Sequence, residues 1–479
     1  MKNVNLVYGV NDKPGLLKTI LFALQQVLAI LAATIVVPVI INNSAEGIEA
    51  GAKMSQSAAL FGAGVGTLVY LLFTKFKSPV FLGSSFAFIG SMCAAFGGAA
   101  SASAGYLGLI IGAILAGLVY VIIALAVKFA GVNWINKIMP AAVIGPTVAI
   151  IGLSLSTNAI GDLFKGSVTA PVEEWVINAT TKLPEFVVNY YPTANTWICL
   201  LCGLITLATV IVCSVYGKKM MKIIPFIIGI GAGYVVATLF TVIGLATNNP
   251  ELQIINFKLF ENMQWFPDFT FVAALDGFGA IDGAFIGTIA VAYIPVAFVV
   301  FAEHLADHKN ISSIIDKDLL KDPGLHRTLL GDGIGSMAGA LFGGCPNTTY
   351  GESVGCVAIS GNASVVTILT AAIICIASAF VAPFMTLLAT IPSCVMGGVC
   401  VTLYGFIAVS GLKMIQKVNL SDNNNLFTVS VILIAGVGGM VLNIGAITIT
   451  SIACALILGI LVNLLGNIKS KKNAQDKAE

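Results

Sequence analysis

Charged residues are scarce in this sequence. Asp, Glu, Lys and Arg make up 10% of the 479 residues, whereas hydrophobic residues make up 58%. Soluble domains carry about 25% charged residues, so the composition predicts an integral membrane protein. The apolar runs are continuous and about 20 residues long. This favours membrane-spanning helices over the short alternating strands of an outer-membrane barrel.

Other absences narrow the function. The net charge is only +2 and the sequence has no basic block with interleaved aromatic residues, so we do not expect nucleic acid as a partner. It also lacks the H-E-x-x-H and G-x-x-x-x-G-K-[ST] motifs, which argues against a zinc-dependent intramembrane hydrolase or an ATP-driven pump. The sequence therefore predicts a protein that is not an enzyme.

Cysteine and the N-terminus give no sign of an oxidising or secreted context. Nearly all of the ten cysteines lie inside apolar runs, where we interpret them as small hydrophobic side chains. We predict neither disulfides, nor a metal site, nor a cofactor. Residues 1–15 lack the apolar core of a cleaved signal peptide, so the first apolar run is expected to direct membrane insertion.

Apolar segments recur along the whole chain with short breaks. Two of them, 79–97 and 345–361, are weak because they are short and interrupted by Gly, Ser, Pro or polar residues. Counting both, we predict fourteen membrane-spanning segments in an all-α polytopic protein. They lie near residues 16–41, 55–74, 79–97, 104–130, 137–156, 195–215, 221–245, 278–306, 327–343, 345–361, 364–389, 391–412, 426–443 and 446–467.

The positions of Lys and Arg indicate the topology. With a cytoplasmic N-terminus and fourteen crossings, 20 of the 24 Lys and Arg residues fall in cytoplasmic segments. Positively charged residues favour the cytoplasmic side, so this bias predicts cytoplasmic N- and C-termini and an even number of spans. Omitting one weak segment would place the loops between the two weak segments on the opposite side of the membrane, and the excess of Lys and Arg on the cytoplasmic side would be lost.

Two local similarities suggest an internal repeat. The pattern Pro-x-x-Val-x-Gly occurs at 140–145 and again at 392–397, and SPVFLGSSFAFIG at 78–90 corresponds to CPNTTYGESVG at 345–355. Their shared order suggests two halves of seven spans each. An odd number of spans gives the halves opposite topology, which is the inverted-repeat plan of secondary transporters.

The two weak segments are the candidate site. We predict that spans 3 and 10 are each a short strand followed by a half-helix, with helix N-termini near 83–86 and 351–353. Such termini offer unpaired amide donors, whereas Glu303 and Glu352 offer carboxylate acceptors. A planar solute with alternating carbonyl and N–H groups would satisfy both, and a simple anion would be repelled by the carboxylates.

Glu303 has two interpretations. Hydropathy places it at the cytoplasmic end of the apolar run 284–302, where a charge is ordinary. If the helix instead continues through residues 304–315, Glu303 lies deeper and faces a cavity, with Asp307 one turn later on the same face. We interpret His304 as interfacial and Asp332 as structural on the cytoplasmic side.

Three stretches of the sequence resemble the nucleobase–ascorbate transporter (nucleobase:cation symporter 2) family, most closely its bacterial uracil permeases. They are GSSFAFIG (83–90), AEHLADHKNISSIIDKDLLKDPGLHR (302–327) and PNTTYGESVG (346–355). The resemblance implies proton-coupled uptake of uracil by alternating access, and a homodimer in the cytoplasmic (inner) membrane of a bacterium. It implies a core domain from 1–131 and 278–390, a gate domain from 132–250 and 391–467, and a cytoplasmic tail from 468–479.

The resemblance also implies roles for residues. Glu303 and Glu352 would bind the pyrimidine, with Ser353 in the same site and backbone amides at Phe86 and Gly351 completing it. Glu303, Glu352 and Asp307 would take part in proton coupling. Asp307 and Gln26 stand where uracil permeases can carry histidine. The resemblance therefore implies no proton relay through a histidine at either position of this chain. The supporting residues around the site would be Gln26, Ser85, Thr349 and Tyr350.

Other functions stay open at this point. A permease for xanthine, urate or another purine would share the same fold, and a nucleobase competition panel would separate it from a uracil permease. An anion transporter of the same architecture would move chloride or sulfate without nucleobase uptake. A membrane-embedded enzyme would change its substrate chemically.

Overall fold

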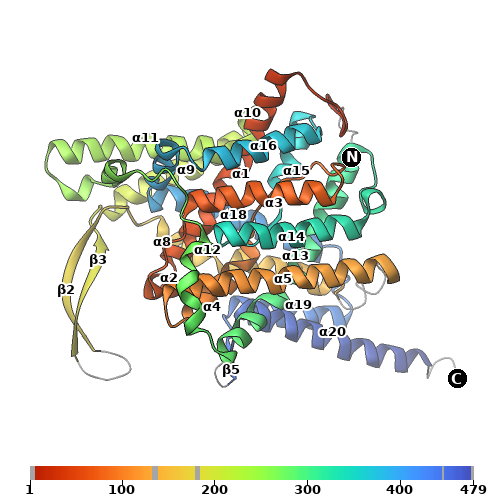
Figure 1. The fold of residues 1–479 in the computed structure, drawn as a ribbon. Helices are drawn as coiled ribbons and strands as arrows, with labels where there is room; N and C mark the ends of the chain where they lie inside the picture. The colour runs from red at the N-terminus through yellow and green to blue at the C-terminus, as the bar shows by residue number, and fades with distance from the viewer. Residues whose placement is uncertain (1–5, 132–138, 178–183, 219, 445–446, 476–479) are drawn as a thin grey trace. The chain divides into compact units, whose positions relative to one another are not determined.

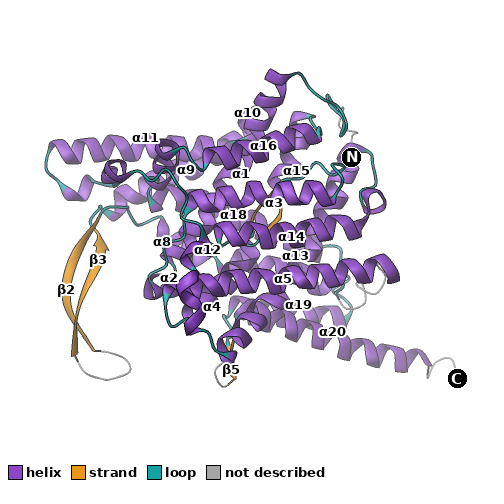
Figure 2. Cartoon of the chain, viewed as in Figure 1, coloured by secondary structure: helices purple, strands orange, loops and turns teal. Residues whose placement is uncertain are grey.

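The computed structural model describes residues 6–131, 139–177, 184–218, 220–444 and 447–475, and helices dominate it (Figure 1, Figure 2). The chain forms two compact units. The first comprises Met1–Leu155, Trp265–Val381 and Leu403–Glu479, and the second comprises Ser156–Gln264 and Ala382–Thr402. Each is described by itself below.

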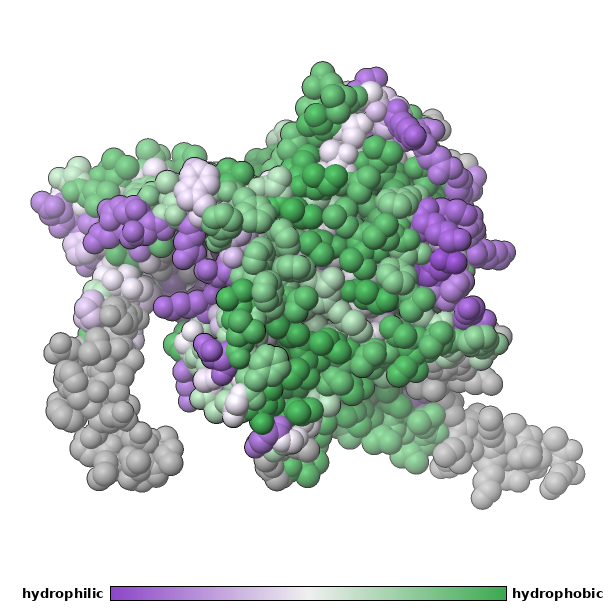
Figure 3. Space-filling model, viewed as in Figure 1, coloured by the Kyte–Doolittle hydropathy of each residue, from purple (hydrophilic) through white to green (hydrophobic). Residues whose placement is uncertain are grey.

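Within the described residues, eight helices are long and apolar enough to cross a membrane, or nine if one broken helix pair counts as a span. Hydrophobic residues cover the face over three central helices, α3, α5 and α14 (Figure 3). An apolar surface of this kind suits contact with lipid rather than water. The protein is thus a multi-pass membrane protein. The count of fourteen spans stays a prediction, because several predicted spans are short or broken helices.

The first unit contains both weak segments of the sequence. Its elements are α1 (Leu16–Asn43), α2 (Ala45–Ala50), α3 (Gln56–Phe73), β1 (Leu82–Ser84), η1 (Phe86–Phe88), α4 (Ile89–Gly97), α5 (Ala102–Ala130), α7 (Ala141–Ser154), α12 (Thr270–Ala273), η4 (Leu275–Ala280), α13 (Gly283–Ile315), η5 (Leu320–Gly324), α14 (Leu325–Gly343), β4 (Asn347–Thr349), α15 (Gly351–Ser360), α16 (Val365–Ser378), the later part of α18 (Ser393–Ile415), α19 (Asn423–Val437), β5 (Leu442–Ile444), β6 (Ile447–Ile449) and α20 (Ser451–Gln475).

Helices α3 and α14 pack closely because glycines line their contact. A Cβ on Gly62 of α3 would lie 2.5 Å from the carbonyl oxygen of Gly339 in α14. Small residues let helix backbones approach in this way inside a membrane. Asn347, which begins β4, donates from Nδ2 to the Gly62 carbonyl at 3.0 Å. The glycine contact and this hydrogen bond together fix β4 against α3.

The two short strands form one antiparallel pair. Leu82 pairs with Thr349, Gly83 with Thr348 and Ser84 with Asn347. Because the strands run in opposite directions, the helical segments that follow them leave the pair in opposite directions. The prediction of a short strand followed by a helix is confirmed at both places, and the inverted repeat built on it stays a prediction.

Helix α13 settles the interpretation of Glu303. It is 33 residues long, begins after Asp282 and continues to Ile315. The Asp282 side chain caps it by accepting a hydrogen bond from the Phe285 amide at 2.7 Å, as expected for an aspartate in the N-cap position. Glu303 therefore lies inside the helix, and the interpretation as an end-of-span surface charge was wrong.

The second unit consists mainly of two long helices and a β-hairpin. Its elements are α8 (Ser156–Asp162), β2 (Thr169–Ile177), β3 (Pro184–Pro192), α9 (Thr196–Tyr216), α10 (Met220–Ile223), α11 (Pro225–Ala246), η2 (Pro250–Leu252), η3 (Phe257–Asn262), α17 (Ala382–Ala389) and the first part of α18. Strands β2 and β3 pair antiparallel from Thr169–Pro192 to Ile177–Pro184.

Candidate functional site

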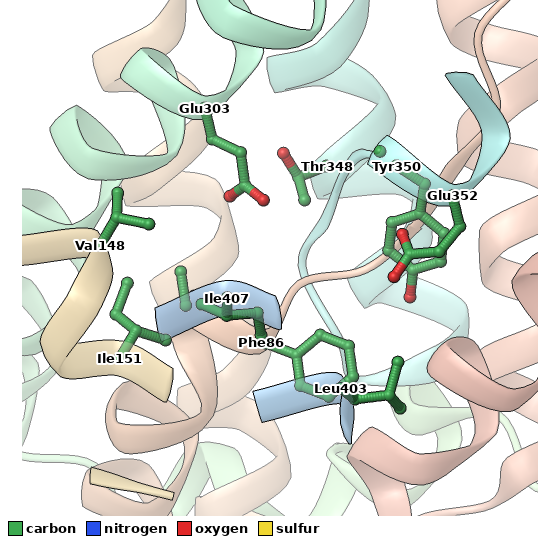
Figure 4. A pocket seen from close by; sticks show the side chains of 11 residues that line it. Phe86, Val148, Ile151, Glu303, Thr348, Tyr350, Glu352, Leu403 and Ile407 are labelled. Carbon is green, nitrogen blue, oxygen red and sulfur yellow. The ribbon is translucent and has the colours of Figure 1, made fainter. Parts of the chain in front are cut away.

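A cavity of about 50 Å³ lies in the first unit where the strand pair meets α13 and α15. Figure 4 shows Glu303 and Glu352 directing their carboxylates toward this space from different elements. Both side chains are half-buried. The structure therefore brings together the two carboxylates that the sequence predicted as substrate ligands. This volume lies well below the roughly 300–1,000 Å³ that is typical of sites for drug-sized ligands.

Backbone donors lie beside the carboxylates. Helix α15 begins at Gly351, and its intrahelical pattern starts with the bond from the Val354 amide to the Tyr350 carbonyl at 3.2 Å. The amides of residues 351–353 precede that bond and belong to the positive end of the helix. Gly351 is exposed and lines the cavity, so a solute with acceptor oxygens can approach its backbone.

Phe86 begins the short helical turn after the other strand and also lines the cavity. Its ring packs edge-to-face on Tyr404, with ring centroids 6.1 Å apart. In Figure 4 the Phe86 ring lies below the two carboxylates, next to Leu403. This position suits contact with the face or edge of a planar ligand.

Sequence reasoning missed the apolar wall of the cavity, which comes from α7 and α18. Ile151 lies eleven residues after Pro140, and Leu403 lies eleven residues after Pro392. The repeated Pro-x-x-Val-x-Gly pattern would therefore have pointed to both positions. The cavity lining missed from the sequence comprises Ala87, Val148, Ile151, Thr348, Leu403 and Ile407.

Asp307 is not among the residues that line the cavity. It is buried and accepts a hydrogen bond from the Thr349 hydroxyl at 2.9 Å. Thr349 belongs to β4 and Asp307 to α13, so the bond ties the strand pair to the helix that carries Glu303. The predicted proton-coupling residue thus lies one turn behind the cavity.

Ser353 also points away from the cavity. It is fully buried, its hydroxyl accepts from the Phe81 amide at 3.1 Å, and the Gln26 amide nitrogen donates to it. Gln26 lies on α1 and does not line the cavity. These contacts hold the start of α15 against α1 and the approach to β1.

The other two supporting residues, Ser85 and Tyr350, directly follow the two strands. The Tyr350 hydroxyl donates to the Ser84 carbonyl at 2.8 Å, and the Ser85 amide donates to the Pro346 carbonyl at 2.9 Å. Tyr350 lines the cavity, whereas Ser85 is buried beside it. Both stabilise the crossing of the two strands.

A second polar cluster was missed from the sequence. His304 is completely buried, and its Nδ1 lies 2.6 Å from Oδ2 of Asp332 on α14. The His308 ring stacks on it at 3.9 Å between centroids, and His308 Nε2 lies 2.6 Å from the Tyr70 hydroxyl. The interpretation of His304 as interfacial was wrong, because a long helix places it in the interior.

The model of a permease family (Xan_ur_permease) matches residues 17–445. The chain belongs to this family. A uracil permease of Bacillus caldolyticus is 37% identical to this chain over 464 residues, which cover 96% of this chain and 94% of the relative. Uracil permeases of Bacillus subtilis (35% identical over 472 residues, covering 97% and 95%) and Escherichia coli K12 (33% over 468 residues, covering 95% and 93%) are also similar. These relatives are permeases and not enzymes.

Solved structures show a transporter fold. The permease resembles the transmembrane domain of the cyanobacterial bicarbonate transporter BicA, with a TM-score of 0.56 and 17% identity, covering 96% of this chain and 99% of that one. It also resembles the murine anion transporter Slc26a9 in the inward-facing state, with a TM-score of 0.63 and 13% identity, covering 96% and 70%. At these identities the likeness concerns the fold alone.

Proposed function

We propose that the permease takes up uracil together with a proton across the cytoplasmic membrane. The observation that carries the proposal is the pair Glu303 and Glu352, whose carboxylates approach one small cavity beside the helix N-terminus at Gly351. The names of the similar bacterial permeases support uracil as the solute.

The recognition chemistry follows from the donors and acceptors of the ring. Uracil carries two ring N–H donors and two carbonyl acceptors. Glu303 and Glu352 accept the N–H groups, and the amides of Phe86 and Gly351 donate to the carbonyls. Hydrogen bonds that involve an ionised partner are stronger than neutral ones, so the two glutamates carry most of the selectivity for a ring with two N–H groups.

Proton coupling follows from the proximity of two carboxylates. Two ionised carboxylates around one small cavity repel each other, and a proton on either removes the repulsion. Glu303, Glu352 and Asp307 are the candidates for the group that takes up this proton. Binding of the proton then prepares the site for a neutral ring, which links proton entry to substrate binding.

Transport by alternating access requires two parts that move relative to each other. We propose the core domain 1–131 and 278–390, which carries the strand pair, and the gate domain 132–250 and 391–467. Fourteen spans in two inverted repeats, cytoplasmic termini with the tail 468–479, and a homodimer complete the proposal.

The test is uptake of radiolabelled uracil by cells or proteoliposomes that contain the permease. Accumulation should require an inward proton gradient and should stop with a protonophore. Uptake that persists fully without the gradient would contradict proton coupling. Absence of uracil uptake in a reconstituted, folded protein would contradict the substrate.

A second candidate is the transport of an anion, because the fold is shared with two anion transporters. The carboxylates of Glu303 and Glu352 oppose it, since they repel an anion in the cavity. Bicarbonate, chloride or sulfate flux without uracil uptake would favour this candidate. Competition distinguishes a purine permease from a uracil permease. In a purine permease, excess unlabelled xanthine or urate would block uptake of the labelled solute better than unlabelled uracil does.

A further inference from the structure

A second, smaller cavity lies between α5, α13 and α14, and α13 also borders the substrate site. Its volume is about 10 Å³, and Tyr120, Asp332, Ser336 and Asn347 are among its lining residues. About 10–15 Å³ is the space that one water molecule needs. Tyr120 and Asp332 are almost completely buried, so this cavity is part of the interior.

Two residues that line this cavity each carry a polar atom without a partner among the described residues. Among the residues that the structure describes, neither Oδ1 of Asp332 nor the Tyr120 hydroxyl makes a hydrogen bond. Buried polar atoms are satisfied by protein or ordered water in the great majority of cases. Two residues that carry such atoms line one water-sized space, which points to a shared ligand.

The hydrogen bonds of His304 fix where protons lie beside this cavity. The Thr328 hydroxyl donates its single hydrogen to the Leu325 carbonyl at 3.0 Å, and its oxygen lies 3.0 Å from His304 Nε2. Nε2 therefore carries the hydrogen of that contact. At 2.6 Å, the contact between His304 Nδ1 and Asp332 Oδ2 requires one more proton between the two atoms.

The pair is consequently neutral overall, as imidazolium with carboxylate or as imidazole with carboxylic acid. A neutral pair does not call for a cation in the adjacent space, whereas Asp332 Oδ1 still needs a donor. Water supplies that donor, and it also pairs with the Tyr120 and Ser336 hydroxyls. A bound water typically makes about three hydrogen bonds, which these three oxygens provide.

We propose that Asp332, Tyr120 and Ser336 bind one water molecule behind the substrate cavity, and that this hydrated centre positions Glu303 through His304. His304 directly follows Glu303 on α13 and is held to α14 through Asp332 and Thr328. The water holds Asp332 in place, and Asp332 holds His304 in place. His304 in turn fixes the rotation of α13 about its own axis, and with it the direction of the Glu303 side chain. The effect on transport rests on the proposed uptake of uracil.

A matched pair of substitutions tests the water site. Tyr120→Phe and Tyr293→Phe each remove a buried hydroxyl that has no protein partner among the described residues, but Tyr293 does not line the small cavity. In the purified permease, Tyr120→Phe should lower the thermal unfolding temperature and Tyr293→Phe should leave it unchanged or raise it. Equal behaviour of the two variants would overturn the water site.

A double-mutant cycle sharpens the test. Ser336→Ala alone should also lower the unfolding temperature, and the combination with Tyr120→Phe should cost less than the sum, because both hydroxyls share one ligand. Additive effects would overturn the shared water. Unfolding temperatures that rise with Na⁺ but not with K⁺ or choline would overturn water in favour of a sodium ion.

The positioning role is read from uracil uptake. Tyr120 does not line the substrate cavity, yet Tyr120→Phe should raise the KM about fivefold, the effect of ~1 kcal/mol or one hydrogen bond, with Vmax per folded transporter unchanged. Tyr293→Phe should keep the wild-type KM. A fall in Vmax alone would overturn positioning and leave a purely structural site. If the wild-type permease transports no uracil, the proposed function fails, whereas the unfolding measurements still decide the water site.

Discussion

The two segments that meet at the strand pair differ in what they bring to the cavity. β1 is followed by Ser85 and then a helical turn that begins at Phe86, whereas β4 is followed by Tyr350 and then a helix that begins at Gly351. The second helical residue is Ala87 in the first segment and Glu352 in the second. Both segments present a helix N-terminus, but only the second carries a carboxylate.

The same backbone arrangement therefore occurs twice with different side chains. Backbone hydrogen bonds pair the two strands, and the strand pair positions both helix starts. In the proposed site the two side chains then have different roles: Phe86 supplies an apolar surface and Glu352 an acceptor. The second acceptor, Glu303, comes from α13, which the Thr349–Asp307 bond ties to β4. The second segment is therefore expected to be the more sensitive to substitution.

The largest effect is expected at Glu352. Glu352→Gln keeps the shape but replaces an acceptor-only carboxylate, so it loses a charge-assisted hydrogen bond of ~1.5–3 kcal/mol, or roughly tenfold to a hundredfold in affinity. Uracil binding to the purified permease measures this loss. Glu261→Gln, at an exposed position in η3, is the control and should bind as the wild type does. Unchanged affinity in Glu352→Gln would remove this residue from the site.

The next effect tests the strand pair itself. A Cβ on Gly83 would lie 2.4 Å from the Tyr350 ring, whereas a Cβ on Gly90 meets its nearest atom at 3.8 Å. Gly83→Ala should displace Tyr350 and destabilise the fold by about 1–3 kcal/mol, as overpacking does. Gly90→Ala should be tolerated. Thermal unfolding in detergent measures the stability of both variants. Equal stabilities would show that the two strands are not tightly packed where Gly83 meets Tyr350.

The link between the second segment and α13 is expected to matter less. Thr349→Val removes the hydroxyl that donates to Asp307 and should cost ~1–1.5 kcal/mol of unfolding free energy. The matched control is Thr370→Val, which removes only a bond to the carbonyl one helical turn earlier, from Thr370 to Val366. Denaturant unfolding compares the two. A loss no greater than that of the control would contradict the role of this bond in holding α13.

The smallest effect is expected in the first segment. Phe86→Leu keeps an apolar side chain and the backbone amide, so it should lose only the aromatic contribution, ~0.5–1 kcal/mol, or about two- to fivefold in KM. Phe129→Leu, 81% exposed at the end of α5, should not change the KM. A loss at Phe86 as large as that at Glu352 would reverse the comparison between the segments.

Much of this comparison was available from the sequence. Pro346 and the polar residues around it predicted a broken span at 345–361, and the repeat predicted its partner at 79–97. The strand and helix that follow were predicted because such residues cannot continue a membrane helix. Glu303 was harder, since hydropathy ends the apolar run before it. The resemblance predicted its place in the site, and the length of α13 shows that it lies inside the helix.

Contacts across the fold could not be predicted in the same way. Ser353 was placed in the substrate site, but its burial against Phe81 and Gln26 depends on tertiary packing. The pairing of His304 with Asp332 joins two helices that hydropathy treats separately. Local patterns indicate where helices break, whereas side-chain partners such as His304 and Asp332, 28 residues apart, emerge only from the packed structure.

The most direct test of the central claim uses the solute rather than the protein. Each of the two uracil ring N–H groups is expected to meet one carboxylate, Glu303 or Glu352. Binding of uracil, 1-methyluracil and 3-methyluracil to the purified permease should therefore show strong binding of uracil and a large loss for both methylated rings. Either methylated ring binding as tightly as uracil would contradict the account of two glutamates accepting two ring N–H groups.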